Sequence, residues 1–212
     1  MAVSLAAALI SAFATLFVVI DPVGLSTLFI GLTAGASRAA RRAIAIEASL
    51  IAFLVLTGAA LFGQWLLTAL GINIASFRIA GGLLLFAIAY EMVFEKRQER
   101  KASTAEPDIA YDAHHSPAAF PLAIPLMAGP GAITAVILLA GRAAGNWLLL
   151  GLYVGIIAAV ILICFAVFLL SGQIERILGR RGQVVLARLL GVLLAALAVQ
   201  YVADGVIALK AL

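Results

Sequence analysis

The chain alternates between long apolar runs and short polar clusters. Asp, Glu, Lys and Arg are absent from six stretches, which cover residues 1–20, 22–37, 48–77, 116–141, 143–174 and 189–203. Because a helix that crosses a bilayer needs about 20 predominantly apolar residues, this pattern predicts an all-α membrane protein with six transmembrane helices. Turn residues and isolated charges place these helices at 4–34, 44–70, 74–94, 118–141, 147–171 and 184–209.

The composition supports a membrane protein. Of the 212 residues, 65% are hydrophobic and 11% are charged, whereas a soluble domain carries about 25% charged residues. So few charges cannot cover a water-exposed surface, which argues against a soluble enzyme, and we expect no enzymatic activity. The single cysteine, Cys164, cannot form an intrachain disulfide, which excludes dithiol exchange. The first residues lack a basic segment, so we expect the apolar start to be retained rather than cleaved as a signal peptide.

The basic residues indicate an orientation. Eleven of the 14 Lys and Arg residues fall in or beside three of the loops between the predicted helices, while Arg78, Arg142 and Lys210 lie on the other side. Loops rich in Lys and Arg face the cytoplasm, which predicts that both termini are periplasmic. The net charge of +4 is explained by these loops, so we expect no nucleic-acid partner.

A polar segment at 95–117 divides the chain into a first three-helix unit, 1–94, and a second, 118–212. We interpret 95–117 as a cytoplasmic linker whose first residues, 95–101, extend the third helix. His114 and His115 have no third ligand nearby in the sequence, so no metal site is expected.

The two units share landmarks in the same order. Pro22 and Pro130 each interrupt the first helix of their unit, and Leu70-Gly71 corresponds to Leu178-Gly179. The motif from Arg78 to Gly81 likewise corresponds to the one from Arg188 to Gly191. Because each unit has an odd number of helices, the second must enter the bilayer from the opposite side. The sequence therefore predicts an inverted repeat, which is typical of transporters.

The proline breaks point to a binding site. Ile20-Asp-Pro-Val-Gly24 and Ala128-Gly-Pro-Gly-Ala132 lie inside apolar runs, and prolines there disrupt helical hydrogen bonds. We expect half-helices to restart at Pro22 and Pro130 with their N–H ends free for a carboxylate. Asp21 offers a negative charge for an ammonium group, a proton or a sodium ion. The small neighbouring residues favour a small substrate.

The predicted substrate-binding residues surround both breaks and comprise Asp21, Pro22, Gly24, Gly129, Pro130, Gly131 and Thr134. The candidates for lining a pathway are Ser26, Thr27, Arg78, Glu91, Arg188 and Gln200. Simpler roles stay open: Asp21 could only cap a helix, the glycines could only allow close packing, and either arginine could pair with a carboxylate.

These motifs resemble the MarC family of bacterial inner-membrane proteins. The resemblance covers essentially the whole chain and rests on Ile20–Gly24, Phe77–Phe86 with Glu91-Met92, Phe120–Thr134, Arg188–Gly191, Ala198–Tyr201 and Asp204-Gly205. It implies a multi-pass protein of the inner membrane, similar in plan to amino-acid exporters of the LysE type. Some members resemble transporters of small neutral amino acids. Ser26-Thr27 departs from the family pattern, in which a proline is common.

The hypothesis that follows is a secondary transporter or exporter of a small polar solute, with a small neutral amino acid favoured. Its expected partners are that solute and the lipid bilayer, and self-association is left open. No cofactor is expected beyond a coupling proton or sodium ion. Two alternatives remain: a lipid-handling membrane protein, and a non-transporting membrane factor whose basic loops contact other proteins.

Overall fold

A computed structural model describes residues 5–97, 117–143 and 145–210, and this part of the chain is helical without a strand. The elements are α1 (Leu5–Ile20), α2 (Pro22–Leu32), α3 (Arg38–Ala69), α4 (Ile74–Val93), η1 (Ala118–Met127), α6 (Pro130–Gly141), α7 (Trp147–Leu169) and α8 (Ser171–Lys210). Five helical segments of the described residues are long and apolar enough to cross a membrane, and the number rises to six if the bent pair of η1 and α6 is counted as one span. The prediction of an all-α membrane protein is therefore confirmed.

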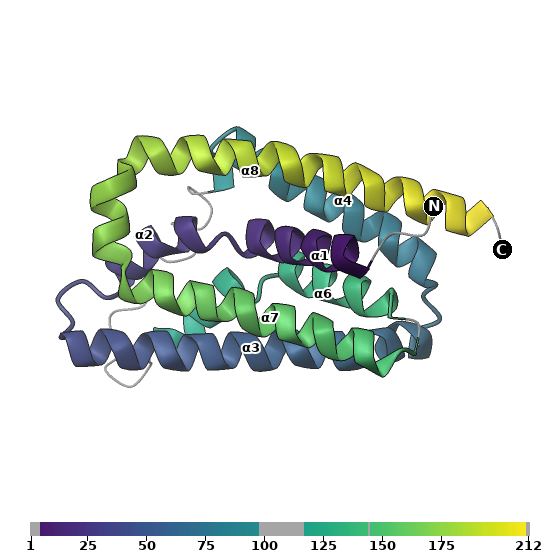
Figure 1. The fold of residues 1–212 in the computed structure, drawn as a ribbon, viewed down its shortest axis with the longest axis horizontal. Coiled ribbons are helices and arrows are strands. Elements are labelled where there is room, and N and C mark those ends of the chain that lie inside the picture. Colours follow the sequence, from purple (N-terminus) through teal and green to yellow (C-terminus); the bar gives the residue numbers. More distant parts are fainter. Residues whose placement is uncertain (1–4, 98–116, 144, 211–212) are drawn as a thin grey trace.

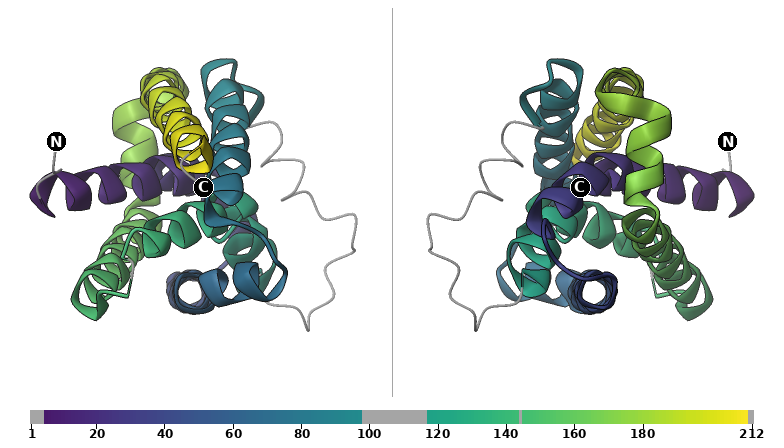
Figure 2. Two further views of the ribbon diagram at one scale, coloured as in Figure 1. Left: turned by 90° about the vertical axis from the view of Figure 1, so that its right-hand side faces the viewer. Right: turned by 90° about the vertical axis from the view of Figure 1, so that its left-hand side faces the viewer.

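The helices form one elongated bundle with two distinct ends (Figure 1). The start of α1, the end of α8 and the α3–α4 turn lie toward one end, here called the terminal end. The opposite end, here called the basic end, holds α2, the start of α3 and the bend of α8 at Gly179, which has a φ of 55°. Figure 2 shows that the N-terminal part of α1 leans away from the other helices, and Leu5 and Ile10 are exposed there.

Side-chain caps set several helix boundaries. Ser37 accepts a hydrogen bond from the Ala40 N–H, so α3 starts at Arg38, six residues before the predicted position. Asn73 caps α4 and Asn146 caps α7 in the same way. The expected extension of the third helix through 95–101 is interrupted at its start: α4 ends at Val93, and Glu95 adopts a left-handed conformation with a φ of 65°. Residues 98–101 lie outside the described residues. His114 and His115 lie outside the described residues.

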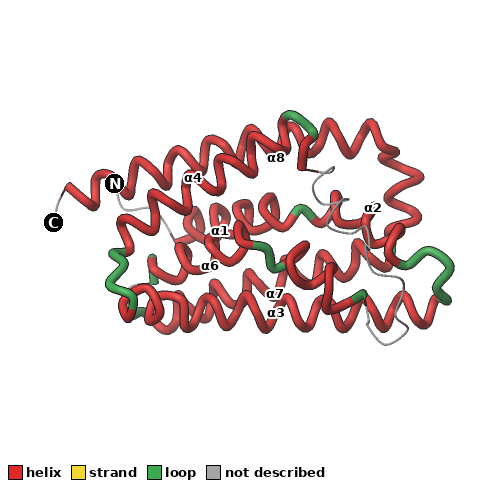
Figure 3. The backbone as a smooth tube through the Cα atoms, turned by 180° about the vertical axis from the view of Figure 1, so that it is seen from behind, coloured by secondary structure: helices red, strands yellow, loops and turns green. Residues whose placement is uncertain are grey.

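The tightest pairing joins α4 and α8, which run antiparallel (Figure 3). A Cβ atom at Gly82 would lie 2.8 Å from the Ala198 carbonyl oxygen, and one at Gly191 would lie 3.1 Å from that of Ala89. Glycines at these positions let the two backbones touch.

The two halves of the chain are interleaved. The second helix of the first half, α3, packs on η1 and α6, while the second helix of the other half, α7, packs on α1 and α2. Phe29 of α2 stacks on Phe168 of α7 with ring centroids 4.7 Å apart. Exchanging the halves preserves this pairing. The inverted repeat itself stays a prediction.

Candidate functional site

The first helix break lies at Asp21, between α1 and α2. Asp21 has φ 60° and ψ 68°, its side chain is 4% exposed, and its Oδ1 accepts a hydrogen bond of 3.1 Å from the Gly24 N–H. A Cβ atom at Gly24 would lie 2.2 Å from Asp21 Oδ2, so glycine is required for this cap. As expected, α2 begins at Pro22. The capping role left open by the sequence is therefore present, in a buried carboxylate.

Arg97 closes the same break from the other side, and the sequence did not single it out. A helix end leaves carbonyl groups without helical partners, and Arg97 donates from Nη2 to the carbonyl of Val19 in the last turn of α1. Arg97 is only 6% exposed. In the sequence it stands in a cluster of charges at 95–101, where nothing distinguishes a buried arginine from an exposed one.

The second break has no charged group of its own. Before it, η1 contains cis peptide bonds at Phe120–Pro121 and Ile124–Pro125, and two of its residues have non-helical conformations. After it, α6 begins at Pro130 as expected, at an angle of 57° to η1. Gly129 precedes α6 in an extended conformation, and no side chain caps this helix. The amide groups of the first turn of α6 therefore receive no capping side chain from Gly129.

The structure brings the two breaks together inside the bundle. A Cβ atom at Gly131, in the first turn of α6, would lie 2.3 Å from Ile88 Cδ1 and 3.3 Å from Val19 Cγ1. Further along α6, the Thr134 methyl group would lie 2.6 Å from a Cβ atom at Gly81. The last turn of α1, the first turn of α6 and the side of α4 are thus in direct contact. In this conformation no solute-sized space separates them.

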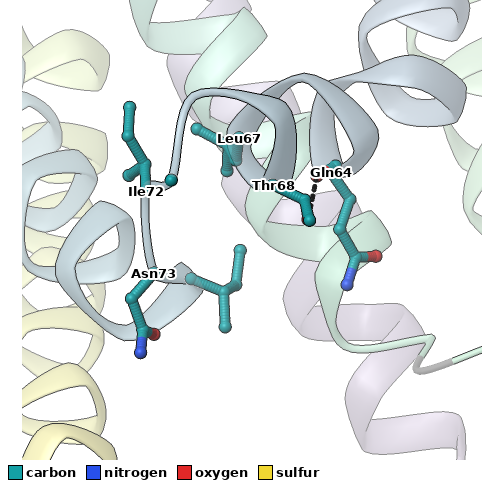
Figure 4. A pocket seen from close by; sticks show the side chains of 7 residues that line it. Gln64, Leu67, Thr68, Ile72 and Asn73 are labelled. Atoms are coloured by element: carbon teal, nitrogen blue, oxygen red, sulfur yellow. Dashed lines mark hydrogen bonds between the residues drawn. The ribbon is translucent and has the colours of Figure 1, made fainter.

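Two cavities are notable in the described part of the chain. A cavity of about 10 Å³ touches Asp21. A larger one, of about 300 Å³, lies at the α3–α4 turn and is lined by residues that include Gln64, Thr68 and Asn73 (Figure 4). These three side chains are exposed and uncharged, and the turn lies at the terminal end, away from α2. We therefore place the candidate site at the small cavity, where buried charges meet, and not at the larger one.

The pathway candidates at the basic end form local contacts. Ser26 Oγ donates to the Val23 carbonyl at 2.6 Å, and Thr27 Oγ1 donates to Gln183 Oε1 of α8 at 2.8 Å. Arg188 pairs with Glu95, so the simpler role considered for it is present. Glu91 lies partly buried in the last turn of α4.

At the terminal end, Gln200 donates to Asp204 Oδ1 at 2.7 Å, and Arg142 lies 3.8 Å from the same carboxylate. The Arg142 guanidinium also lies 4.8 Å from the centre of the Tyr201 ring. Arg78 lies partly buried on α4. Gln200 is exposed and the structure does not bring it to the breaks. The pairing of Arg142 with Asp204 was not predicted, because the two residues lie 62 positions apart in the chain.

Comparisons with known proteins cover nearly the whole chain. The profile described as "MarC family integral membrane protein" matches residues 6–209. A UPF0056 membrane protein of Archaeoglobus fulgidus is 41% identical over 92% of this chain and 90% of its own length. The UPF0056 membrane protein YhcE of Escherichia coli K12 is 36% identical over 92% and 89%, and YvbG of Bacillus subtilis 168 is 34% identical over 93% of each. No solved structure matches the chain.

Proposed function

The chain belongs to the MarC family of integral membrane proteins, and from this premise we propose that it is a secondary transporter or exporter of a small polar solute, with a small neutral amino acid favoured. One observation carries the proposal: the carboxylate of Asp21 is buried at a helix break, and the second broken helix packs beside that break. Ionisable groups inside a membrane protein are costly and usually have a task. Broken helices in corresponding positions favour a transport site.

In this proposal each break contributes groups that bind the solute or the coupling cation. Asp21 binds the ammonium group of the solute or the coupling cation, a proton or a sodium ion. The first turn of α6 offers N–H groups and the positive end of its helix dipole to the solute. Because Val19, Ile88 and Gly131 are in contact, the conformation described is closed, and transport requires α1 and α6 to separate.

We also propose an orientation of the protein in the membrane. The basic end faces the cytoplasm because the first turns of α3, with Arg38, Arg41 and Arg42, and the bend of α8, beside Arg176 and Arg181, lie there. Both termini are then outside the cytoplasm. In a bacterial cell this membrane would be the inner membrane. The inverted repeat is supported by the exchanged packing of the two second helices, α3 on η1 and α6, and α7 on α1 and α2.

Labelled alanine tests the proposal in proteoliposomes that contain either the wild type or Asp21→Asn. Asparagine tolerates the left-handed conformation and caps helices about as well as aspartate, so this change removes the charge and keeps the local structure. We expect the variant to unfold at the wild-type temperature. Its alanine flux should fall at least about tenfold, because a hydrogen bond to a charged group contributes a free energy that corresponds to this factor. Flux equal to that of the wild type would remove Asp21 from the mechanism.

A further inference from the structure

Polar and charged side chains also gather at the terminal end of the bundle, where α6 ends. Arg142 follows the last residue of α6, and its guanidinium lies 3.8 Å from the Asp204 carboxylate of α8 and 4.8 Å from the centre of the Tyr201 ring. Gln200 donates a hydrogen bond of 2.7 Å to the same carboxylate. These contacts define a polar region that is separate from both helix breaks.

Arg78 of α4 is directed toward the space between α6 and α8. It stands three and four residues before Gly81 and Gly82, and residues at this spacing share a helix face. A Cβ atom at Gly81 would lie 2.6 Å from the Thr134 methyl group of α6, and one at Gly82 would lie 2.7 Å from Val202 Cγ2 of α8. The side chain of Arg78 therefore starts on the side of α4 that these two helices cover, and it is partly buried there.

A close contact between α4 and α8 brings Arg78 to the level of Asp204. A Cβ atom at Gly205, next to Asp204, would lie 3.1 Å from the backbone nitrogen of Ile79, next to Arg78. Asp204 in turn pairs with Arg142. Two arginines from different helices thus reach the same part of α8, where Asp204 provides a single carboxylate.

Two donors of this region have no hydrogen-bond partner in the part of the chain that the structure describes, namely the Arg78 Nε and the Tyr201 hydroxyl. Tyr201 is only 2% exposed, and buried polar groups are normally hydrogen-bonded. Arg78 lies inside a candidate membrane span, where an ionisable group is costly and usually has a task. It also stands near the start of α4, where the helix dipole does not favour a cation. Unused N–H and O–H donors beside an excess of positive charge suit an anion.

We propose that Arg78 and Tyr201 bind the carboxylate of a small solute, with Arg142 and Asp204 beside them; these four residues are here called the terminal site. A guanidinium binds a carboxylate through two parallel hydrogen bonds, and the Tyr201 hydroxyl adds a third. Asp204 offers its charge to an ammonium group, so the carboxylate belongs to a free acid or to an amino acid. The inference goes beyond the proposed function, because it uses neither helix break and holds whether or not the solute is transported.

A carboxylate can reach the terminal site by parting the Arg142–Asp204 pair. The two side chains are 30% and 34% exposed, and ion pairs exposed to this extent contribute little to stability. Their separation of 3.8 Å is also longer than a direct hydrogen bond. Exchange of the Asp204 carboxylate for that of the solute therefore costs little and gives the solute a second guanidinium.

Calorimetric binding of propionate and of propionamide to the purified full-length protein tests the role of Arg78. The two compounds have the same size, and only propionate has a carboxylate. We expect the wild type to bind propionate at least about tenfold more tightly than propionamide. In Arg78→Gln this ratio should fall to near one, and in Arg78→Lys, which keeps the charge and loses the fork, it should be intermediate. Lys210→Gln, an exposed cation of α8 at the same end, is the matched control and should keep the wild-type ratio.

Tyr201→Phe provides a second readout that does not depend on the charge. It removes a buried hydroxyl that has no partner within the described residues, so the unfolding temperature should stay the same or rise. Binding of propionate should nevertheless weaken about tenfold, because a donor to its carboxylate is lost. A purely structural role of Tyr201 predicts no change in binding, and that result would contradict its part in the terminal site.

The source of the carboxylate follows from a third compound, alanine. Tighter binding of alanine than of propionate, with the advantage lost in Asp204→Asn, identifies an amino acid, whereas equal or weaker binding of alanine identifies a free acid. Both results support the terminal site.

The inference is overturned if the wild type does not prefer propionate to propionamide, or if the ratio is unchanged in Arg78→Gln. The second result is expected if Arg78 only extends its charge toward the membrane surface. If Arg78→Gln does not fold, Arg78→Lys and Tyr201→Phe decide. Alanine flux in wild-type proteoliposomes without a preference for propionate defeats this inference and leaves the proposed function standing. A preference that depends on Arg78, in a protein without alanine flux, does the reverse.

Discussion

The two helix breaks share a restart at a proline but differ in the side chains that surround them. Each restarts a half-helix at a proline, Pro22 or Pro130. At the first, a left-handed Asp21 caps α2 with its own carboxylate, and Arg97 satisfies a carbonyl at the end of α1. At the second, Gly129 provides no cap, and neighbouring side chains fill the space. The same backbone arrangement, a half-helix that restarts at a proline, is therefore surrounded by charged side chains at the first break and by packed apolar side chains at the second.

Glycine shows the same difference at atomic scale. At Gly24 the atom that excludes a side chain is a carboxylate oxygen of Asp21, so glycine there protects a polar cap. At Gly131 the excluding atom is the terminal methyl group of Ile88, so glycine there permits close packing. The comparison teaches that the charged side chains of the proposed site come from the first break, whereas the second break offers only backbone N–H groups. The second break governs how closely α6 approaches α1 and α4.

The largest effect on stability is expected from Asp21→Ala. Alanine removes the cap, at about 1 kcal/mol, and must adopt a left-handed conformation, at roughly 1–2 kcal/mol more. Asp21→Asn keeps both features and should lose less than about 0.5 kcal/mol. Unfolding in detergent, followed by circular dichroism, measures both variants. Equal losses would show that the first break does not depend on this cap.

A smaller effect is expected from Gly131→Ala at the second break. The added Cβ would lie 2.3 Å from Ile88 Cδ1, and overpacking of this kind costs about 1–3 kcal/mol. Adding Ile88→Val removes the colliding methyl group and should restore part of the loss. Gly155→Ala on α7 is the control, because nothing lies within 4 Å of its Cβ position, and alanine stabilises a helix by up to about 1 kcal/mol. If Ile88→Val gives no rescue, close packing is not what glycine provides at this break.

The contrast between the breaks also marks what the sequence could and could not predict. The all-helical membrane architecture and the restarts at Pro22 and Pro130 depend on local chemistry, namely apolar length and the missing proline N–H. Local chemistry of this kind can be predicted from the sequence. The cap by Asp21 was predicted as one of two roles, beside binding, because capping also depends on residues close together in the sequence. The role of Asp21 in binding stays a prediction.

Contacts between distant segments could not be predicted. The burial of Arg97 depends on where the end of α4 lies relative to α1, 78 residues earlier in the chain. The end of α4 was predicted to within one residue, but the left-handed conformation of Glu95 that follows it was not, because a glutamate gives no sequence signal comparable to a glycine. The irregular η1 was not predicted, although Pro121 and Pro125 inside it disfavour a regular helix.

The smallest effect is expected at the hydrogen bond that links α2, after the first break, to α8. Thr27 Oγ1 donates to Gln183 Oε1 at 2.8 Å, and Gln183 is 4% exposed, so Thr27→Val leaves a mostly buried acceptor without this donor. We expect a loss of about 1 kcal/mol, limited because Thr27 itself is exposed and other donors can approach. Thr27→Ser retains the hydroxyl and should stay close to the wild type in the same detergent unfolding experiment. If serine and valine lose the same stability, then α2 is held by packing, as α6 is, and the distinction between a polar break and a packed break does not extend beyond Asp21 and Arg97.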